Sequence, residues 1–88
     1  MDIAAIKDAI ETKVYHLTAK MNVPLHQHDD QDEIFYCIKG AGVGVLENSE
    51  TELLPGSAFI VPAGTMHSLK TEGDLYVGSF LVPVVADE

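Results

Sequence analysis

Short apolar runs separated by turn-forming residues make up most of the chain. Runs rich in Val, Ile, Leu, Phe and Tyr alternate with turn clusters at intervals of about ten residues. These clusters are Asn22-Val23-Pro24, Lys39-Gly40-Ala41-Gly42, Glu47-Asn48-Ser49-Glu50, Pro55-Gly56, Pro62-Ala63-Gly64 and Glu72-Gly73-Asp74. Many short strands at this spacing are typical of a sandwich or barrel, so we expect an all-β fold.

The first twenty residues carry two different periodicities. Apolar residues recur near helical spacing at Ile3, Ile6 and Ile10, which predicts a short helix over 2–11, with an extra edge strand as the alternative. The following segment, 13–21, alternates with a period of two, which is typical of a strand buried on one side. One face would carry Tyr15, Leu17, Ala19 and Met21, and the other Val14, His16, Thr18 and Lys20.

The C-terminal run LYVGSFLVPVVA, residues 75–86, is almost entirely apolar. A strand with one wet face should alternate, so we expect this strand to be covered on both faces. A second subunit would provide that cover, and symmetric dimers are the commonest oligomers, so we expect a homodimer. Pro83 cannot donate to a sheet ladder, so the strand should end there or lie at an edge.

Composition is consistent with one folded domain. The chain has 88 residues, of which 47% are hydrophobic. That supports a real but thin core and argues against disorder. Because no linker, repeat or low-complexity segment interrupts the sequence, we expect a single domain over residues 1–88.

The charge balance narrows the possible partners. There are 14 acidic residues against 5 basic ones, for a net charge of −9, and every basic residue is a lysine. An acidic surface disfavours nucleic acid and anionic membranes. The absence of arginine removes the bidentate clamp for a carboxylate or phosphate. We therefore expect no nucleic-acid or membrane partner, and a small, largely uncharged molecule as ligand.

The sequence also indicates a compartment. Cys37 is the single cysteine, so no internal disulfide can form. The N-terminal MDIAAIKDAI has neither the basic region nor the long apolar core of a signal peptide. No apolar run reaches the ~18 residues of a membrane span. We expect a soluble, cytoplasmic protein.

Two histidines and a glutamate lie close together in LHQHDDQDEIFYCIKG, residues 25–40. Residues i and i+2 of a strand point the same way, so His26 and His28 should face one side together. The acidic loop that follows is short enough for a hairpin, which would return Glu33 beside them. Two neutral imidazoles and a carboxylate suit one divalent transition metal: Zn, Fe, Mn, Ni or Cu.

A second stretch, GSAFIVPAGTMHSL over 56–69, supports a metal site. A tight turn at 62–64 redirects the chain, and His67 then begins the next strand. It is the natural fourth ligand, arriving from elsewhere in the sheet.

Together the two stretches resemble the cupin family. The first family motif, G-x5-HxH-x3/4-E-x6-G, matches at His26, His28, Glu33 and Gly40, and the second, G-x5-PxG-x2-H-x3-N, matches at Gly56, Pro62, Gly64 and His67. The leading glycine is replaced by Lys20 and the closing asparagine by Thr71, neither of which is a ligand position. The resemblance, over about residues 20–71, implies a small jelly-roll barrel and a metal held by His26, His28, Glu33 and His67.

Strand parity predicts a largely apolar pocket around this site. If Glu33 points inward, Phe35 and Cys37 do so too, and an inward His67 carries Leu69 and Thr71 inward. We expect the pocket to be lined by Phe35, Cys37, Phe59, Val61 and Leu69. Cys37 is read as a small buried apolar residue rather than a ligand or reactive thiol.

The alternative interpretation is a polar, solvated hairpin without a metal. His16 is expected to be exposed and outside the site, and the run of Asp29, Asp30 and Asp32 to be a solvated loop. Retention of all four ligand types favours the metal site.

Two functions remain open, since the fold does not choose between them. One is a metal-dependent oxygenase or isomerase, and the other is a non-catalytic module whose metal anchors a ligand or stabilises the barrel. The inward faces offer little further acid or base, only Cys37 and the tyrosines, so no catalytic residue is assigned. A purely structural dimer with an empty site is disfavoured by the four retained ligands.

Overall fold

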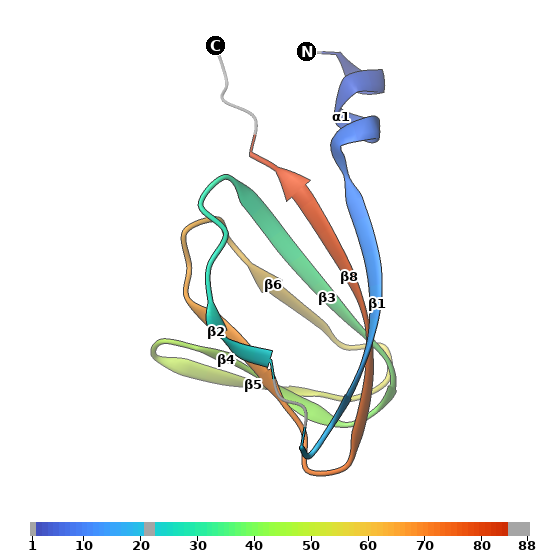
Figure 1. Ribbon diagram of the computed structural model, residues 1–88, viewed down its shortest axis with the longest axis vertical. Coiled ribbons are helices and arrows are strands. Elements are labelled where there is room, and N and C mark those ends of the chain that lie inside the picture. The colour runs from blue at the N-terminus through green and yellow to red at the C-terminus, as the bar shows by residue number, and fades with distance from the viewer. Residues whose placement is uncertain (1, 21–22, 85–88) are drawn as a thin grey trace.

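The computed structural model describes residues 2–20 and 23–84, which form one short helix and two four-stranded antiparallel sheets (Figure 1). In chain order the elements are α1 (Ile3–Ala9), β1 (Glu11–Thr18), β2 (Val23–His26), β3 (Gln31–Gly40), β4 (Gly42–Leu46), β5 (Ser49–Leu53), β6 (Ala58–Val61), β7 (His67–Lys70) and β8 (Asp74–Pro83). The long sheet has the strand order β1-β8-β3-β6, and the short sheet has the order β2-β7-β4-β5. The predicted all-β jelly-roll fold is confirmed.

The core lies between the two sheets because side chains alternate along each strand. On β3, Glu33, Phe35 and Cys37 are buried, whereas Tyr36 and Ile38 are exposed, as strand parity predicted. The other strands contribute inward residues in the same way. The core cluster comprises Leu17, Phe35, Cys37, Leu53, Phe59, Val61, Leu69, Leu75 and Val77.

The N-terminal segment confirms the predicted helix and shifts the predicted strand. Asp2 caps α1, its carboxylate accepting a 3.0 Å hydrogen bond from the amide of Ala4. The strand expected over 13–21 begins at Glu11 and ends at Thr18. Of its expected inward face only Leu17 is buried. Tyr15 and Ala19 are exposed, and Met21 lies outside the described residues.

The C-terminal strand lies inside the long sheet, between β1 and β3 (Figure 1). The strand ends at Pro83, which was one of the two outcomes expected for this proline. Residues 85 and 86 of the apolar run lie outside the described residues. The inner face of β8 is covered by the core, but on the outer face Phe80 is exposed. Within the single chain only the inner face is covered, and cover of the outer face by a second subunit stays a prediction. Among the described residues, no helix is long and apolar enough to cross a membrane.

Candidate metal centre

The four predicted ligands come together between the two sheets. His26 ends β2 and pairs in register with His67, the first residue of β7, and both strands belong to the short sheet. His28 follows in the connection after β2, and Glu33 lies on β3 of the long sheet. The expected β2–β3 hairpin is wrong, because these two strands lie in different sheets. The crossing between sheets is what brings Glu33 opposite the histidines.

The distances within this cluster fit a single metal ion. Glu33 Oε1 lies 3.0 Å from His67 Nε2 and 3.4 Å from His28 Nε2. One possible ligand atom from each of the four residues lies within 4.8 Å of every other. Bonds of ~2.1 Å to a common ion place neighbouring ligand atoms ~3.0 to ~3.4 Å apart, for octahedral or tetrahedral geometry. The cluster is therefore compatible with a divalent metal.

The surroundings of His67 independently fit a cation. Its Nδ1 donates a 3.0 Å hydrogen bond to the carbonyl of Thr65, and its Nε2 faces Glu33 Oε1. A neutral imidazole carries only one N–H, so with Nδ1 donating, the Nε2 lone pair points at a carboxylate oxygen. A cation between those two atoms, either a proton or a metal ion, resolves the conflict. Because His67 is completely buried, such a charge is poorly screened by water there.

The carboxylate of Glu33 is oriented by a residue that sequence reasoning missed. Ser79 on β8 donates a 2.6 Å hydrogen bond to Glu33 Oε2, and both side chains are buried. Oε1 is thereby left to face the histidines. Ser79 is the one small hydroxyl residue in the apolar C-terminal run. That exception, at a position with inward parity, was the signal that could have found it.

The turn before β7 is tied to the β2–β3 connection. The amide of Gly64 donates a 2.7 Å hydrogen bond to the carbonyl of His28, and the amide of Ala63 donates a 2.7 Å bond to Asp32. Gly64 has φ of +79°, a backbone conformation that favours glycine. These bonds hold His28 and His67 at fixed separation. The side chain of His28 is 32% exposed, so the cluster opens to solvent on that side.

The predicted pocket-lining residues are buried together in the core. Phe35, Phe59 and Val61 are at most 3% exposed, and Cys37 and Leu69 are fully buried. The ring of Phe35 lies 6.0 Å from that of His67, so this apolar group adjoins the metal-compatible cluster. Whether these residues line a ligand cavity stays a prediction.

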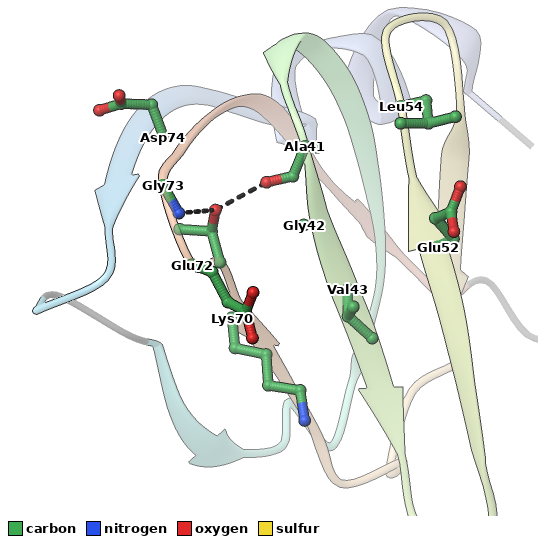
Figure 2. A pocket seen from close by; sticks show the side chains of 10 residues that line it. Ala41, Gly42, Val43, Glu52, Leu54, Lys70, Glu72, Gly73 and Asp74 are labelled. Carbon is green, nitrogen blue, oxygen red and sulfur yellow. Dashed lines mark hydrogen bonds between the residues drawn. The ribbon is translucent and has the colours of Figure 1, made fainter.

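An open groove of about 630 Å³ lies away from the four ligands, between β4, β5 and the turn after β7 (Figure 2). Its wall includes Thr71, whose hydroxyl donates a 2.6 Å hydrogen bond to the carbonyl of Ala41 and accepts one from the amide of Gly73. Thr71, one of the two residues that depart from the cupin motifs, thus braces the β7–β8 turn. None of the residues predicted to line the ligand pocket contributes to this groove.

The remaining candidate residues lie outside the cluster. Burial raises the pKa of the Cys37 thiol, with a smaller opposing effect from the Lys39 backbone, so the thiol is a poor nucleophile. His16 is exposed, as predicted, and its Nε2 lies 2.8 Å from Asp74 while its ring stacks on Tyr76.

Comparison with known proteins places these features in context. A family model described as a cupin domain matches residues 14–83. The uncharacterized protein MJ1618 of Methanocaldococcus jannaschii is 31% identical over 51 residues, which are 58% of this chain and 41% of that protein. The chain therefore spans less than half the length of this curated relative.

Solved structures resemble the whole barrel. A predicted oxalate decarboxylase from Thermotoga maritima has a TM-score of 0.80 at 21% identity. The match covers 96% of this chain and 76% of the chain of that structure. KdgF from a Halomonas species has a TM-score of 0.76 at 30% identity. The match covers 86% of this chain and 71% of the KdgF chain. The likeness to the Thermotoga maritima protein shows the fold alone.

Proposed function

The chain belongs to the cupin family, and on that premise we propose that it holds one divalent transition metal, Zn, Fe, Mn, Ni or Cu, through His26, His28, Glu33 and His67. We propose that it uses the metal as an oxygenase or isomerase of a small, largely uncharged molecule. The observation that carries this is the buried contact of His67 Nε2 with Glu33 Oε1, 3.0 Å apart with His28 beside them. When bound, the metal would supply Lewis acidity and open coordination positions.

The residues around the cluster would each have a separate task. Thr65 and Ser79 hold His67 and Glu33 in fixed orientations through the hydrogen bonds described above. The apolar residues beneath, Phe35 among them, keep water from the inner side. His28, the partly exposed ligand, marks the side from which a small molecule can approach.

A non-catalytic binding module is the alternative, and one observation favours it. The buried polar side chains among the described residues are Glu33, His67, Thr71 and Ser79. Thr71 is occupied in a turn and Ser79 in its bond to Glu33, so among the described residues the other buried titratable group is the Cys37 thiol, whose pKa is raised by burial. Under this alternative the metal anchors a ligand or stabilises the barrel without turnover.

Elemental analysis of protein purified without chelator tests the proposal. We expect about one equivalent of metal in the natural protein, none in His67→Ala, and an unchanged content in His16→Ala, the matched control outside the cluster. Iron, manganese or copper would direct the next assay to oxygen consumption, and zinc or nickel to isomerisation. A metal-free protein whose stability is unaffected by added metal would overturn the metal centre.

We further propose that residues 1–88 form a single domain that works as a homodimer in the cytoplasm. The support for the dimer is the exposed apolar face of the long sheet, where Ile60 and Phe80 face solvent in the single chain. The support for the compartment is Cys37, a buried thiol without a disulfide partner, which suits a reducing environment. Fractionation of the source cells tests the compartment.

A further inference from the structure

The inner face of the long sheet reaches solvent along the first half of its edge strand, β1. Partner residues on antiparallel strands project from the same face of a sheet. Lys13 is the partner of Ser79 on β8, and Tyr15 is the partner of Val77. Ser79 and Val77 are buried between the sheets, whereas Lys13 is exposed and Tyr15 is 37% exposed. The side chain of Lys13 therefore lies on the face that carries the metal cluster, at a position that water reaches.

Lys13 is close to the cluster in the register of the sheet. Ser79 lies in one row between Lys13 on β1 and Phe35 on β3, and Glu33 is the next inward residue along β3. Two strand spacings are ~9.6 Å and two residues of strand are ~6.8 Å, so the Cα atoms of Lys13 and Glu33 lie ~12 Å apart. The four-carbon stem of a lysine spans about half of that distance. The remaining gap between the ammonium and the metal is one that a small molecule can bridge.

The cluster opens toward the end of the barrel where β1 begins. His28, the partly exposed ligand, is followed by Asp30, whose carbonyl accepts a 3.1 Å hydrogen bond from the amide of Val84 just after β8. Leu81, near the same end of β8, is the partner of Glu11 at the start of β1. Figure 1 shows α1, the start of β3 and the end of β8 together toward the top of the view. The open side of His28 and the exposed start of β1 thus share one end of the barrel.

The ammonium of Lys13 has no partner within the part of the chain that the structure describes. No carboxylate of residues 2–20 and 23–84 lies within ion-pair distance of it, not even that of Glu11 on the same face. The other lysines of the described strands are engaged elsewhere. Lys70 pairs with Glu50 at 3.1 Å, and Lys39 lies over the ring of Tyr76. Lys13 is therefore the strand lysine that is left for a ligand.

A lysine in this place selects an anion, and a carboxylate fits best. One ammonium is a compact point charge that balances one negative charge. A phosphate group carries about −1.5 to −2 at neutral pH, which exceeds what Lys13 alone can balance. The exposed carboxylates of Glu11, Asp29 and Asp30 at the same end of the barrel repel an anion from other positions. The place of the bound carboxylate is thereby fixed at Lys13.

We propose that Lys13 is a specificity-determining residue, which binds a carboxylate of a small molecule whose other end contacts the metal. This inference rests on the proposed metal function, and it narrows the largely uncharged molecule to one with a single acidic group remote from its metal-binding end. A chain of about three to six carbons spans the gap between the metal and the ammonium. β1 then forms one wall of the ligand site.

Calorimetric titration of the metal-loaded full chain with succinate and with succinamate tests the role of Lys13. The two probes have the same length, and each can place one carboxylate on the metal, but only succinate brings a second negative charge to the lysine. We expect Lys13→Gln to lower the ratio of succinate affinity to succinamate affinity about threefold to fivefold, as for an exposed charge pair. Lys13→Arg keeps the charge and should keep the ratio of the natural protein.

Lys20→Gln is the matched control. Lys20 is also exposed and follows the opposite end of β1, so this variant loses the same charge but should leave the ratio unchanged. All three substitutions are at exposed positions, where the fold tolerates change, and circular dichroism checks that each variant is folded.

The outcomes separate this inference from the metal centre. A ratio that is unchanged in Lys13→Gln, or that falls as much in Lys20→Gln, overturns the role of Lys13 alone. A metal-loaded natural protein that binds neither probe also overturns that role, while its metal content still supports the cluster. A natural protein that takes up no metal overturns the metal centre and the role of Lys13 together.

Discussion

The Ser79 hydroxyl donates a 2.6 Å hydrogen bond to Glu33 Oε2, joining two buried side chains 46 residues apart. The two residues lie on neighbouring strands, where Leu81 is the direct partner of Glu33 and Ser79 is the partner of Phe35. The bond therefore runs diagonally across β3 and β8. It directs Glu33 Oε1 toward His67.

Replacing this hydroxyl is expected to weaken metal binding without removing a ligand. In Ser79→Ala the carboxylate of Glu33 loses its orienting donor, and loss of such an outer partner lowers metal affinity about 10- to 100-fold. Competition with a chromophoric chelator measures the change. The absorption spectrum of the cobalt-substituted protein should also shift, because the carboxylate is free to turn.

Ser49→Ala, at an exposed position on β5, is the control and should leave both readouts unchanged. Equal metal affinity and an identical cobalt spectrum in Ser79→Ala would contradict a positioning role for this hydroxyl.

The turn before His67 is expected to require glycine at position 64. Gly64 has φ of +79°, and an L-residue in this region costs about 1 to 2 kcal/mol, so Gly64→Ala should lower the free energy of unfolding by that amount. Urea unfolding measures it. Gly73→Ala is the control, because Gly73 is not among the positive-φ glycines and an added Cβ there meets nothing within 4 Å. Equal free energies of unfolding for Gly64→Ala and the natural protein would contradict the requirement for glycine, because the turn would then have adjusted to alanine.

Metal removal is expected to destabilise the barrel. An ion that binds only the folded chain contributes about 2.7 kcal/mol when present at one hundred times its dissociation constant. In a domain of this size that corresponds to a Tm difference of about 10 to 20 °C between metal-loaded and chelator-treated protein. Differential scanning calorimetry measures the difference, which should vanish in His67→Ala and persist in His16→Ala. A natural protein with the same Tm in both states would speak against a folded-state metal site.

Stability is expected to fall at alkaline pH through Cys37. Burial raises the pKa of this thiol above its ordinary value of 9.0, so the folded chain keeps the proton at a pH where the unfolded chain has lost it. Where the folded state binds more protons, the free energy of unfolding decreases as pH rises. The free energy of unfolding is therefore unaffected by the Cys37 thiol below pH 9.0 and falls as the pH rises above that value.

Urea unfolding between pH 7 and pH 10 checks this, with Cys37→Ala as the reference. The quantity to compare is the slope of the free energy of unfolding against pH, because the substitution itself leaves a cavity that lowers stability at every pH. Parallel profiles for the two proteins would contradict the raised pKa.

Local patterns were sufficient for the short helix and for the face that β3 buries. Alternation along β3 correctly placed Glu33, Phe35 and Cys37 inward and Tyr36 outward, because the two-residue period of a strand is a property of the backbone. The helical spacing of Ile3 and Ile6 likewise predicted α1. The ends of β1 were misplaced: its pairing with β8 runs from Glu11 to Thr18, so the strand begins and ends earlier than its alternation predicted.

The amino-acid sequence by itself determined the set of candidate ligands and the all-β class, because residue type, spacing and period are local quantities. The tertiary structure alone decided that β2 and β3 lie in different sheets, that Ser79 reaches Glu33, and that the outer face of β8 is left open. Each of these depends on contacts between residues far apart in the chain. Such contacts follow from how the sheets pair and pack, which no local period encodes.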